Sequence, residues 1–256
     1  MLSYIYRAVL FPAKRAAPSR LGRYFLSLPI IFDLISMMMQ LFDLSKVFKL
    51  KGLGKLGDSH FDEVRDYNAG VTVDKKITTT RRAEEYYAVL VIPQGNVEDE
   101  KLLIVGPRNV QELFIAWTFG FRWKNIVGID LYSTNAKIIE MNMEKMTFPD
   151  SSFDAISMAN TLSYAKSTRT ALSEVARVLK PGGRFAFSAT YDPNERWSED
   201  AVSGAEIKAI LDDLNLRVYV HYSADKINAL GRTQTSHTFA VKKSASSDAK
   251  FDDFHI

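Results

Sequence analysis

The chain has 256 residues, of which 46% are hydrophobic and 25% charged, and its formal net charge is +3. This balance is typical of a globular protein that buries a sizeable core. The chain has no cysteine, which excludes disulfides and thiolate metal sites, and its four histidines show no ligand spacing, so we expect no metal site.

Positive charge is concentrated before residue 58. The basic residues there are Arg7, Lys14, Arg15, Arg20, Arg23, Lys46, Lys49, Lys51 and Lys55, and only Asp33 and Asp43 oppose them. We therefore expect residues 1–57 to form a basic and apolar helical extension, followed by a main domain at 58–243 and a polar, disordered tail at 244–256. A basic block of this kind favours an anionic partner, such as a membrane surface, nucleic acid or an acidic substrate.

An apolar run at 25–48 predicts a helix inside the extension. Apolar side chains recur at helical spacing at Ile31, Leu34, Ile35, Met38, Met39 and Phe42, whereas Asp33, Ser36, Gln40 and Asp43 fall mainly on the other side. A membrane span is disfavoured because Pro29 interrupts the run and a central acid costs about 2.5–3.5 kcal/mol on insertion scales. Three roles stay open: a helix packed on the main domain, a helix lying in a membrane interface, or a removed organellar transit segment.

Strands and helices alternate through the rest of the chain. A glycine-rich linker is expected at 50–58 and a helix at 80–91. Strands are then predicted at 101–106, 125–131, 137–143, 153–159, 183–190, 216–223 and 237–243, and helices at 109–119, 168–179 and 205–214. Continuous apolar strands that alternate with helices indicate an α/β fold with a largely parallel sheet covered on both faces.

Ligands of open parallel sheets bind beyond the carboxyl ends of the strands. This rule selects residues 106–109 after the first predicted strand, Asp130 after the second, Asn142 and Met143 after the third, and residues 160–164 after the fourth. The Asp130 carboxylate can accept two hydrogen bonds from a ribose diol. The alternative for Asp130 taken alone is a helix N-cap or a surface acid.

Two later motifs are more specific. The sequence "FPDSSFD" at 148–154 and the sequence "EVARVLKPGGRF" at 174–185 resemble the class I S-adenosylmethionine-dependent methyltransferase family, in its type 11-like form, and the resemblance extends over 101–243. Gly182 and Gly183 are expected to adopt positive φ where the chain reverses. The resemblance implies a methyltransferase enzyme with a Rossmann-like, doubly wound, mostly parallel seven-stranded sheet whose last strand is antiparallel, and with S-adenosylmethionine as its cofactor.

The resemblance also implies roles for the residues at the strand ends. Gly106 would admit the methionine portion of the cofactor, and Asp130 would hold its ribose. Asn142, where many relatives have Asp, and Met143 would hold its adenine.

Three further residues complete the predicted site. Arg108 and the helix start at Asn109 would face the cofactor carboxylate, since a helix N-terminus suits an anion. Asn160 would contact the cofactor and, together with Tyr164, position the acceptor. Thr161, Ser163, Thr190 and Tyr191 lie where they could assist.

The chain departs from the family pattern in two places. Its loop keeps a single glycine, Gly106, which is followed by Pro107 and Arg108; Asn109 and Glu112 form a capping-box-like pair that still starts a helix there. Only eleven residues separate Asp130 from Asn142, too few for a helix and a strand. We therefore expect a turn at 132–136 and thin cover on one side of the cofactor site.

The leading functional hypothesis is S-adenosylmethionine-dependent methyl transfer to a small-molecule, glycan or lipid-linked acceptor, with the extension as an acceptor lid or as a contact for a membrane surface or a protein partner. The alternative is a non-catalytic methyltransferase-like subunit or scaffold that has lost cofactor binding. A nucleic-acid acceptor is disfavoured because "MANTLSYA" lacks the family's Asn/Asp-Pro-Pro-aromatic signature, and a dehydrogenase because Gly-x-Gly-x-x-Gly is missing. The expected location is cytoplasmic, with a peripheral membrane position or organellar import left open.

Overall fold

The computed structural model describes residues 28–50, 54–74, 83–191, 203–227 and 233–245, together with Gly22 and Leu26. Several sequence predictions lie outside the described residues. They concern the basic side chains before residue 24, the start of the helix expected at 80–91, and most of the tail expected from residue 244.

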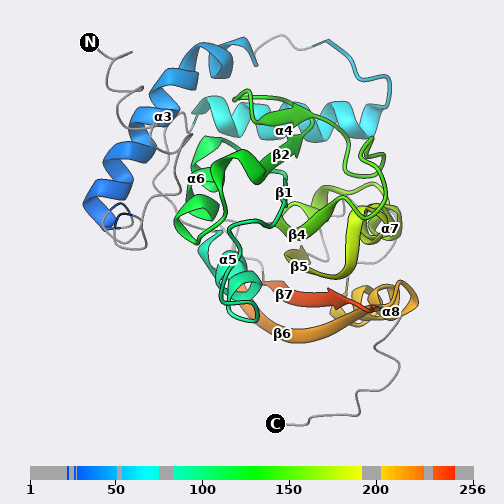
Figure 1. Cartoon of the computed structure of the whole chain (residues 1–256). Coiled ribbons are helices and arrows are strands. Elements are labelled where there is room, and N and C mark those ends of the chain that lie inside the picture. Colours follow the sequence, from blue (N-terminus) through cyan, green and yellow to red (C-terminus); the bar gives the residue numbers. More distant parts are fainter. Residues whose placement is uncertain are drawn as a thin grey trace.

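A seven-stranded sheet with the strand order β3-β2-β1-β4-β5-β7-β6 forms the centre of the protein (Figure 1). The strands are β1 (Leu102–Val105), β2 (Ile126–Asp130), β3 (Ile138–Glu140), β4 (Phe153–Met158), β5 (Leu179–Tyr191), β6 (Leu216–Ile227) and β7 (Thr233–Lys243). Strands β1 to β5 pair in parallel, and β7 runs antiparallel between β5 and β6. The predicted mostly parallel sheet with an antiparallel last strand is confirmed.

Helices cover both faces of the sheet, with α5 (Glu84–Val91) and α6 (Val110–Thr118) on one side and α7 (Thr168–Val178) and α8 (Gly204–Asp213) on the other (Figure 1). The side chains of strand β1 explain why both faces are covered. Leu102 and Ile104 join the apolar cluster that contains α5 and α6, while Leu103 and Val105 join the cluster that contains α7 and α8. Because successive side chains of a strand point to opposite faces, a strand that is apolar throughout requires cover on both.

The chain reversal before β5 tests the prediction of positive φ at two glycines. Gly182 has φ +76°, as predicted, but the φ of Gly183 is not in the left-handed region, so that part of the prediction is wrong. Gly183 is needed for a close approach instead, because a Cβ there would lie 2.8 Å from the Lys180 carbonyl oxygen.

Helix α3 (Pro29–Lys49) confirms that the apolar run of the extension packs on the main domain. The Phe32 ring stacks on Phe114 of α6 with 5.0 Å between ring centroids. No helix among the described residues meets the length and apolarity that crossing a membrane requires.

The face that α3 buries is not the predicted one. Ser36 and Gln40 are 0% and 2% exposed, whereas Leu34 is 58% exposed. The buried polar groups meet polar partners in the domain: Asn109 Nδ2 donates to Gln40 Oε1 at 3.1 Å, and Asn135 Nδ2 donates to Asp43 Oδ2 at 2.7 Å. The prediction that these polar residues face away from the apolar contact is wrong for Ser36, Gln40 and Asp43. Gln40 and Asp43 hydrogen-bond to the loops after β1 and β2, and the Ser36 hydroxyl accepts a hydrogen bond from Gln40 within α3.

Helix α4 (Ser59–Asp74) covers the side of the sheet that the missing helix leaves open. Residues 131–137 form only bends and turns, which confirms the turn predicted there. Tyr132 in this turn is buried against α3 and α4, and its hydroxyl lies 2.8 Å from Thr72 Oγ1. The prediction of thin cover is therefore wrong, because α4 packs where the shortened connection leaves room.

Replacing the buried Gln40 with leucine is expected to destabilise the protein, although the change makes α3 more apolar. The free energy of unfolding should fall by about 1–3 kcal/mol because the buried Asn109 amide loses its acceptor. The opposite change on the same helix, Leu34→Gln at an exposed position, should stay within about 0.5 kcal/mol. Urea unfolding of both variants measures the difference, and equal effects would show that α3 is not seated in this way.

Candidate cofactor-binding site

A cavity opens at the carboxyl ends of β1 to β4 and contains about 720 Å³ of atom-free space, counting its open mouth. The strand order places β3, β2, β1 and β4 side by side, so the residues that follow these strands meet at this edge.

Most of the predicted site residues line this cavity. They are Gly106, Arg108, Asp130, Asn142, Met143, Asn160 and Tyr164. Asn109 does not line it: the residue is 6% exposed, and its Oδ1 accepts a hydrogen bond from the Gln111 backbone N–H at 2.9 Å. Asn109 is therefore the N-cap of α6, as the sequence predicts, and its side chain is not directed to a ligand.

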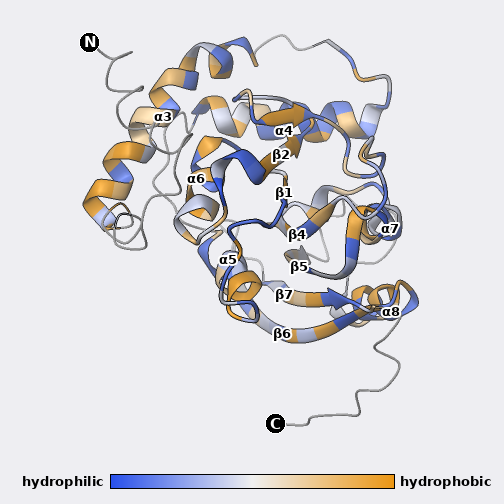
Figure 2. Ribbon diagram, in the orientation of Figure 1, coloured by the Kyte–Doolittle hydropathy of each residue, from blue (hydrophilic) through white to orange (hydrophobic). Residues whose placement is uncertain are grey.

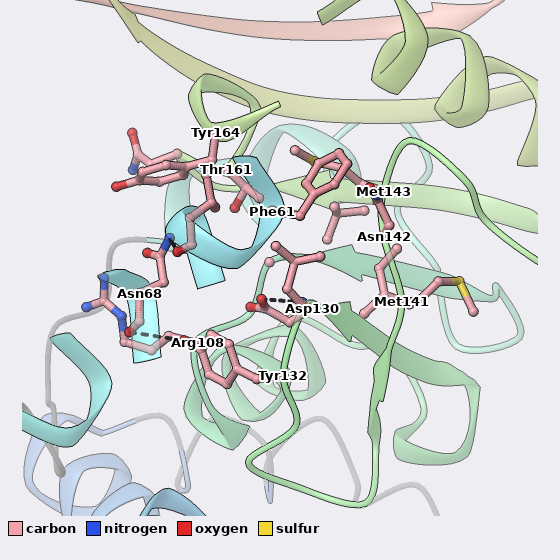
Figure 3. A pocket seen from close by; sticks show the side chains of 16 residues that line it. Phe61, Asn68, Arg108, Asp130, Tyr132, Met141, Asn142, Met143, Thr161 and Tyr164 are labelled. Carbon is pink, nitrogen blue, oxygen red and sulfur yellow. Dashed lines mark hydrogen bonds between the residues drawn. The ribbon is translucent and has the colours of Figure 1, made fainter. Parts of the chain in front are cut away.

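The lining residues follow the order of the strands. Figure 3 shows Arg108 near Asn68 at one end of the cavity, Asp130 in the middle, and Asn142 and Met143 at the other end. Asp130 Oδ1 accepts a hydrogen bond from the Leu131 backbone N–H at 2.7 Å, which fixes the plane of the carboxylate.

The altered glycine loop is well accommodated. Gly106 has φ +72°, and a Cβ there would lie 2.2 Å from Thr161 Oγ1, so no other residue fits without rearrangement. Pro107 fits against the next strand because Gly128 has no side chain; a Cβ on Gly128 would be 2.8 Å from Pro107 Cγ. One glycine is thus needed for the loop itself, and a second glycine makes room for its proline.

Asn142 is held in a local turn. Its Oδ1 accepts a hydrogen bond from the Glu144 backbone N–H at 2.8 Å, the arrangement of an Asx turn. An amide oxygen has two lone pairs, so this oxygen can accept a second hydrogen bond. Met143 is half-buried and packs against the core beside α7 and α8.

Asn160 is oriented by a buried hydroxyl network. Ser188 Oγ donates to Asn160 Oδ1 at 2.9 Å and accepts from the Asn160 N–H at 3.0 Å and from the Tyr86 hydroxyl at 2.8 Å. A serine hydroxyl has one donor and two acceptor sites, so these three hydrogen bonds use every site of the Ser188 hydroxyl. Burial raises the pKa of Tyr86, which keeps its hydroxyl protonated. The network turns Asn160 Oδ1 toward Ser188, so the Nδ2 group is the part of the amide that can donate to a ligand.

Replacing Ser188 with alanine is expected to lower the free energy of unfolding by about 1–3 kcal/mol, because the buried Tyr86 hydroxyl then lacks its acceptor. Adding Tyr86→Phe removes the stranded hydroxyl, so the double variant should be more stable than the sum of the two single changes predicts. Thermal and urea unfolding measure this coupling. Strictly additive effects would contradict the network.

Helix α4 contributes cavity residues that the sequence does not reveal, namely Phe61, Val64 and Asn68. The start of the helix is held against the segment after β4: Lys166 Nζ lies 3.0 Å from Asp58 Oδ2, and His60 Nε2 lies 3.1 Å from the Tyr164 carbonyl oxygen. The Lys166 hydrogen bond is the main cause of a lowered pKa at Asp58. No local sequence pattern indicates that the start of α4 contacts the segment after β4.

Two other residues at this edge have structural partners. Ser163 Oγ donates to the Thr190 carbonyl oxygen at 3.3 Å and accepts from the Thr190 N–H at 2.9 Å, so it ties the segment after β4 to β5.

Across the ranges that the structure describes, no group of three or more His, Asp or Glu side chains could hold a metal ion.

Comparison with known proteins agrees with this geometry. Residues 108–187 match a family model described as a methyltransferase domain. A ubiquinone/menaquinone biosynthesis C-methyltransferase of Hahella chejuensis is 43% identical over 54 residues, which cover 21% of this chain and 22% of that protein. The chain thus matches about a fifth of the length of this relative.

Solved structures resemble a larger part of the chain. The Burkholderia thailandensis 1,6-didemethyltoxoflavin-N1-methyltransferase has a TM-score of 0.51 at 14% identity, covering 72% of this chain and 87% of that one. The geranyl diphosphate C-methyltransferase of Streptomyces coelicolor has a TM-score of 0.50 at 12% identity, covering 75% and 86%. The fold is Rossmann-like, with a cavity at the carboxyl ends of its parallel strands. The match to a methyltransferase domain covers residues 108–187, and the fold is that of the methyltransferases of known structure to which the chain is similar.

Proposed function

We propose that the protein transfers a methyl group from S-adenosylmethionine to a small-molecule, glycan or lipid-linked acceptor. The observation that carries this proposal is the meeting of Gly106, Asp130, Met143 and Asn160 around one open cavity at the strand ends. The cavity is not filled by the protein's own side chains, as it would be in a member that had lost its ligand.

The chemistry of the lining fits the parts of the cofactor in order. Arg108 supplies a cation for the carboxylate, and Gly106 leaves room for the methionine chain beside it. The fixed Asp130 carboxylate accepts hydrogen bonds from the ribose hydroxyls. Asn142 and the thioether of Met143 bind the edge and the face of adenine. This order matches the strand order β1, β2, β3.

When bound, the cofactor supplies an electrophilic methyl carbon on a positively charged sulfur. The contribution of the chain is to hold the acceptor atom in line with that carbon and to exclude water, and positioning of this kind supplies much of the acceleration. Asn160 Nδ2, Thr161 and Tyr164 are the polar groups at the end of β4 that orient the acceptor. The aromatic ring of Phe61 on α4 closes the same region, which favours a small or extended acceptor over a folded macromolecule.

Calorimetric titration of the full chain with S-adenosylmethionine and with S-adenosylhomocysteine tests the proposal. We expect one ligand per chain, and the two ligands should compete. Nicotinamide adenine dinucleotide serves as the control because it shares the adenosine but needs a different phosphate loop. A folded protein that releases no heat with high micromolar concentrations of either sulfur ligand would overturn the proposal.

The runner-up is a non-catalytic methyltransferase-like subunit or scaffold. The single-glycine loop favours it, as does the hydrogen bond that already uses one of the two lone pairs of the Asn142 amide oxygen. Gly106→Arg places a long side chain in the cavity and separates the two functions. If the protein is a scaffold, a folded Gly106→Arg variant keeps its cellular function; if it is an enzyme, the variant loses both cofactor binding and function.

A further inference from the structure

Helix α4 forms one wall of the cavity, and the ends of the strands form the other. Phe61, Val64 and Asn68 on α4 line the cavity, and Figure 3 shows Phe61 and Asn68 above Asp130 in that view. A ligand that lies between the two walls contacts both of them. Such a ligand enters and leaves most readily when α4 moves away from the strand ends.

The second half of α4 is anchored by apolar packing. Ala69 and Val73 are 4% and 6% exposed, and they form one buried cluster with Val47 of α3 and Tyr132 of the turn after β2. Thr72 Oγ1 lies 2.8 Å from the Tyr132 hydroxyl in the same place. Because separating these groups would expose buried apolar surface, we expect this half of the helix to stay in position.

The start of α4 is held by polar contacts that water reaches. The Asp58 and Lys166 side chains, 3.0 Å apart, are each 37% exposed, and His60 Nε2 lies 3.1 Å from the Tyr164 carbonyl oxygen. Figure 2 shows hydrophilic and hydrophobic residues interspersed along α4. A half-exposed ion pair contributes little to stability, because water solvates both charges when they separate. The two ends of α4 are therefore held by contacts of different strength.

The residues around the start of α4 are also bonded to one another. The Leu56 N–H donates to Asp62 Oδ1 at 2.7 Å, and Arg65 Nη2 lies 3.2 Å from the same oxygen. Arg65 Nη1 donates to the Gly54 carbonyl oxygen at 2.5 Å. These contacts lie within residues 54–66, so they are kept when the segment moves as one unit.

Lys166 connects the start of α4 to the loop that follows β3. Its side chain meets Asp58, and its backbone N–H donates to Glu144 Oε1 at 2.6 Å. The Glu144 N–H in turn donates to Asn142 Oδ1, and Asn142 is the residue proposed above to bind the edge of adenine. One residue thus contacts both the cover of the cavity and the loop beside the adenine position.

We propose that residues 54–66 are a lid that opens to exchange the cofactor, and that Lys166 latches this lid through Asp58. Opening separates the ion pair and moves Phe61 out of the cavity, while the second half of α4 stays packed against α3. The inference rests on the proposed function, because the exchange of S-adenosylmethionine is the step that the lid controls.

A reversible cross-link across the latch tests the proposal, and the chain suits it because it contains no cysteine. In the double variant Asp58→Cys, Lys166→Cys, a bifunctional methanethiosulfonate reagent joins the two thiols and dithiothreitol releases them. We expect the cross-link to slow both the association and the release of tritiated S-adenosylmethionine by about tenfold or more. Reduction should restore both rates, which shows that the variant is folded.

The matched control is the double variant Arg169→Cys, Asp213→Cys. This ion pair has the same type of contact, 2.9 Å long, but it joins α7 to α8, and neither residue lines the cavity. The same cross-link there should leave both rates unchanged.

Asp58→Asn tests the latch without a cross-link. An amide at this position keeps the oxygen that accepts from the His60 N–H at 2.9 Å, but it loses the charge that attracts Lys166. Release of tritiated S-adenosylmethionine should become about two- to fivefold faster. Asp213→Asn, which breaks the control pair, should not change it.

The outcomes separate the lid from the proposed function. If the parent protein binds S-adenosylmethionine and the cross-link across the latch changes neither rate, the lid is overturned and the proposed function stands. Equal slowing by the two cross-links would also overturn the lid. A folded parent protein that binds no S-adenosylmethionine would overturn both.

Discussion

Asp130→Ala is expected to weaken the binding of S-adenosylmethionine about 100-fold, because two charge-assisted hydrogen bonds to the ribose are lost. The Asp130 carboxylate lines the middle of the cavity, and the Leu131 N–H holds it in place. Asp130→Asn should fall between alanine and the parent protein, since an amide keeps one oxygen acceptor but places a donor where the second acceptor was.

The matched control for Asp130 is Glu140→Gln. Glu140 is the partner of Asp130 in the register of β2 and β3, but it is exposed and does not line the cavity. Removing its charge should leave affinity nearly unchanged. Similar losses in both variants would mean that general negative potential, and not a specific contact with the ribose, accounts for binding. Titration calorimetry with each folded variant distinguishes the two cases.

The core of the site could be predicted from sequence because topology brings it together. Once apolar strands alternate with helices, the carboxyl ends of the parallel strands must share one edge, so Gly106, Asp130, Met143 and Asn160 converge whatever the details of their loops. The cap at Asn109 was also predictable, since it depends on neighbouring residues of the same helix. That the Asn109 side chain would not line the cavity could not be predicted, because its amide group donates to Gln40 of a distant helix.

The orientation of α3 could not be read from its own sequence. Phe32 and Met39 are buried and Leu34 and Leu41 are exposed, although all four are strongly apolar. Periodicity identifies the helix, but with apolar residues on both sides it does not decide which side faces inward. The side of α3 that faces inward is decided by its hydrogen-bonding partners, Asn109 and Asn135, which lie in loops far along the chain. The cover that α4 gives to the cavity is hidden for the same reason, since Tyr132 and Thr72 meet only in the folded protein.

Gly106→Ala is expected to lower the free energy of unfolding by about 2–5 kcal/mol. Left-handed backbone costs an L-residue roughly 1–2 kcal/mol, and forcing a methyl group into occupied space adds about 1–3 kcal/mol. All three of the nearest atoms to the added Cβ, at 2.2 to 2.8 Å, belong to the Thr161 side chain. Urea unfolding measures the loss.

Gly182→Ala separates the two costs, because Gly182 has φ +76° but no atom within 4 Å of an added Cβ. Only the backbone cost of roughly 1–2 kcal/mol is expected there. Thr161→Gly combined with Gly106→Ala should restore part of the stability, since it removes the atoms that the new methyl group meets. If Gly106→Ala lowered the free energy of unfolding no more than Gly182→Ala does, the loop after β1 would not lie against the segment after β4. The cavity that both segments line would then need a different shape.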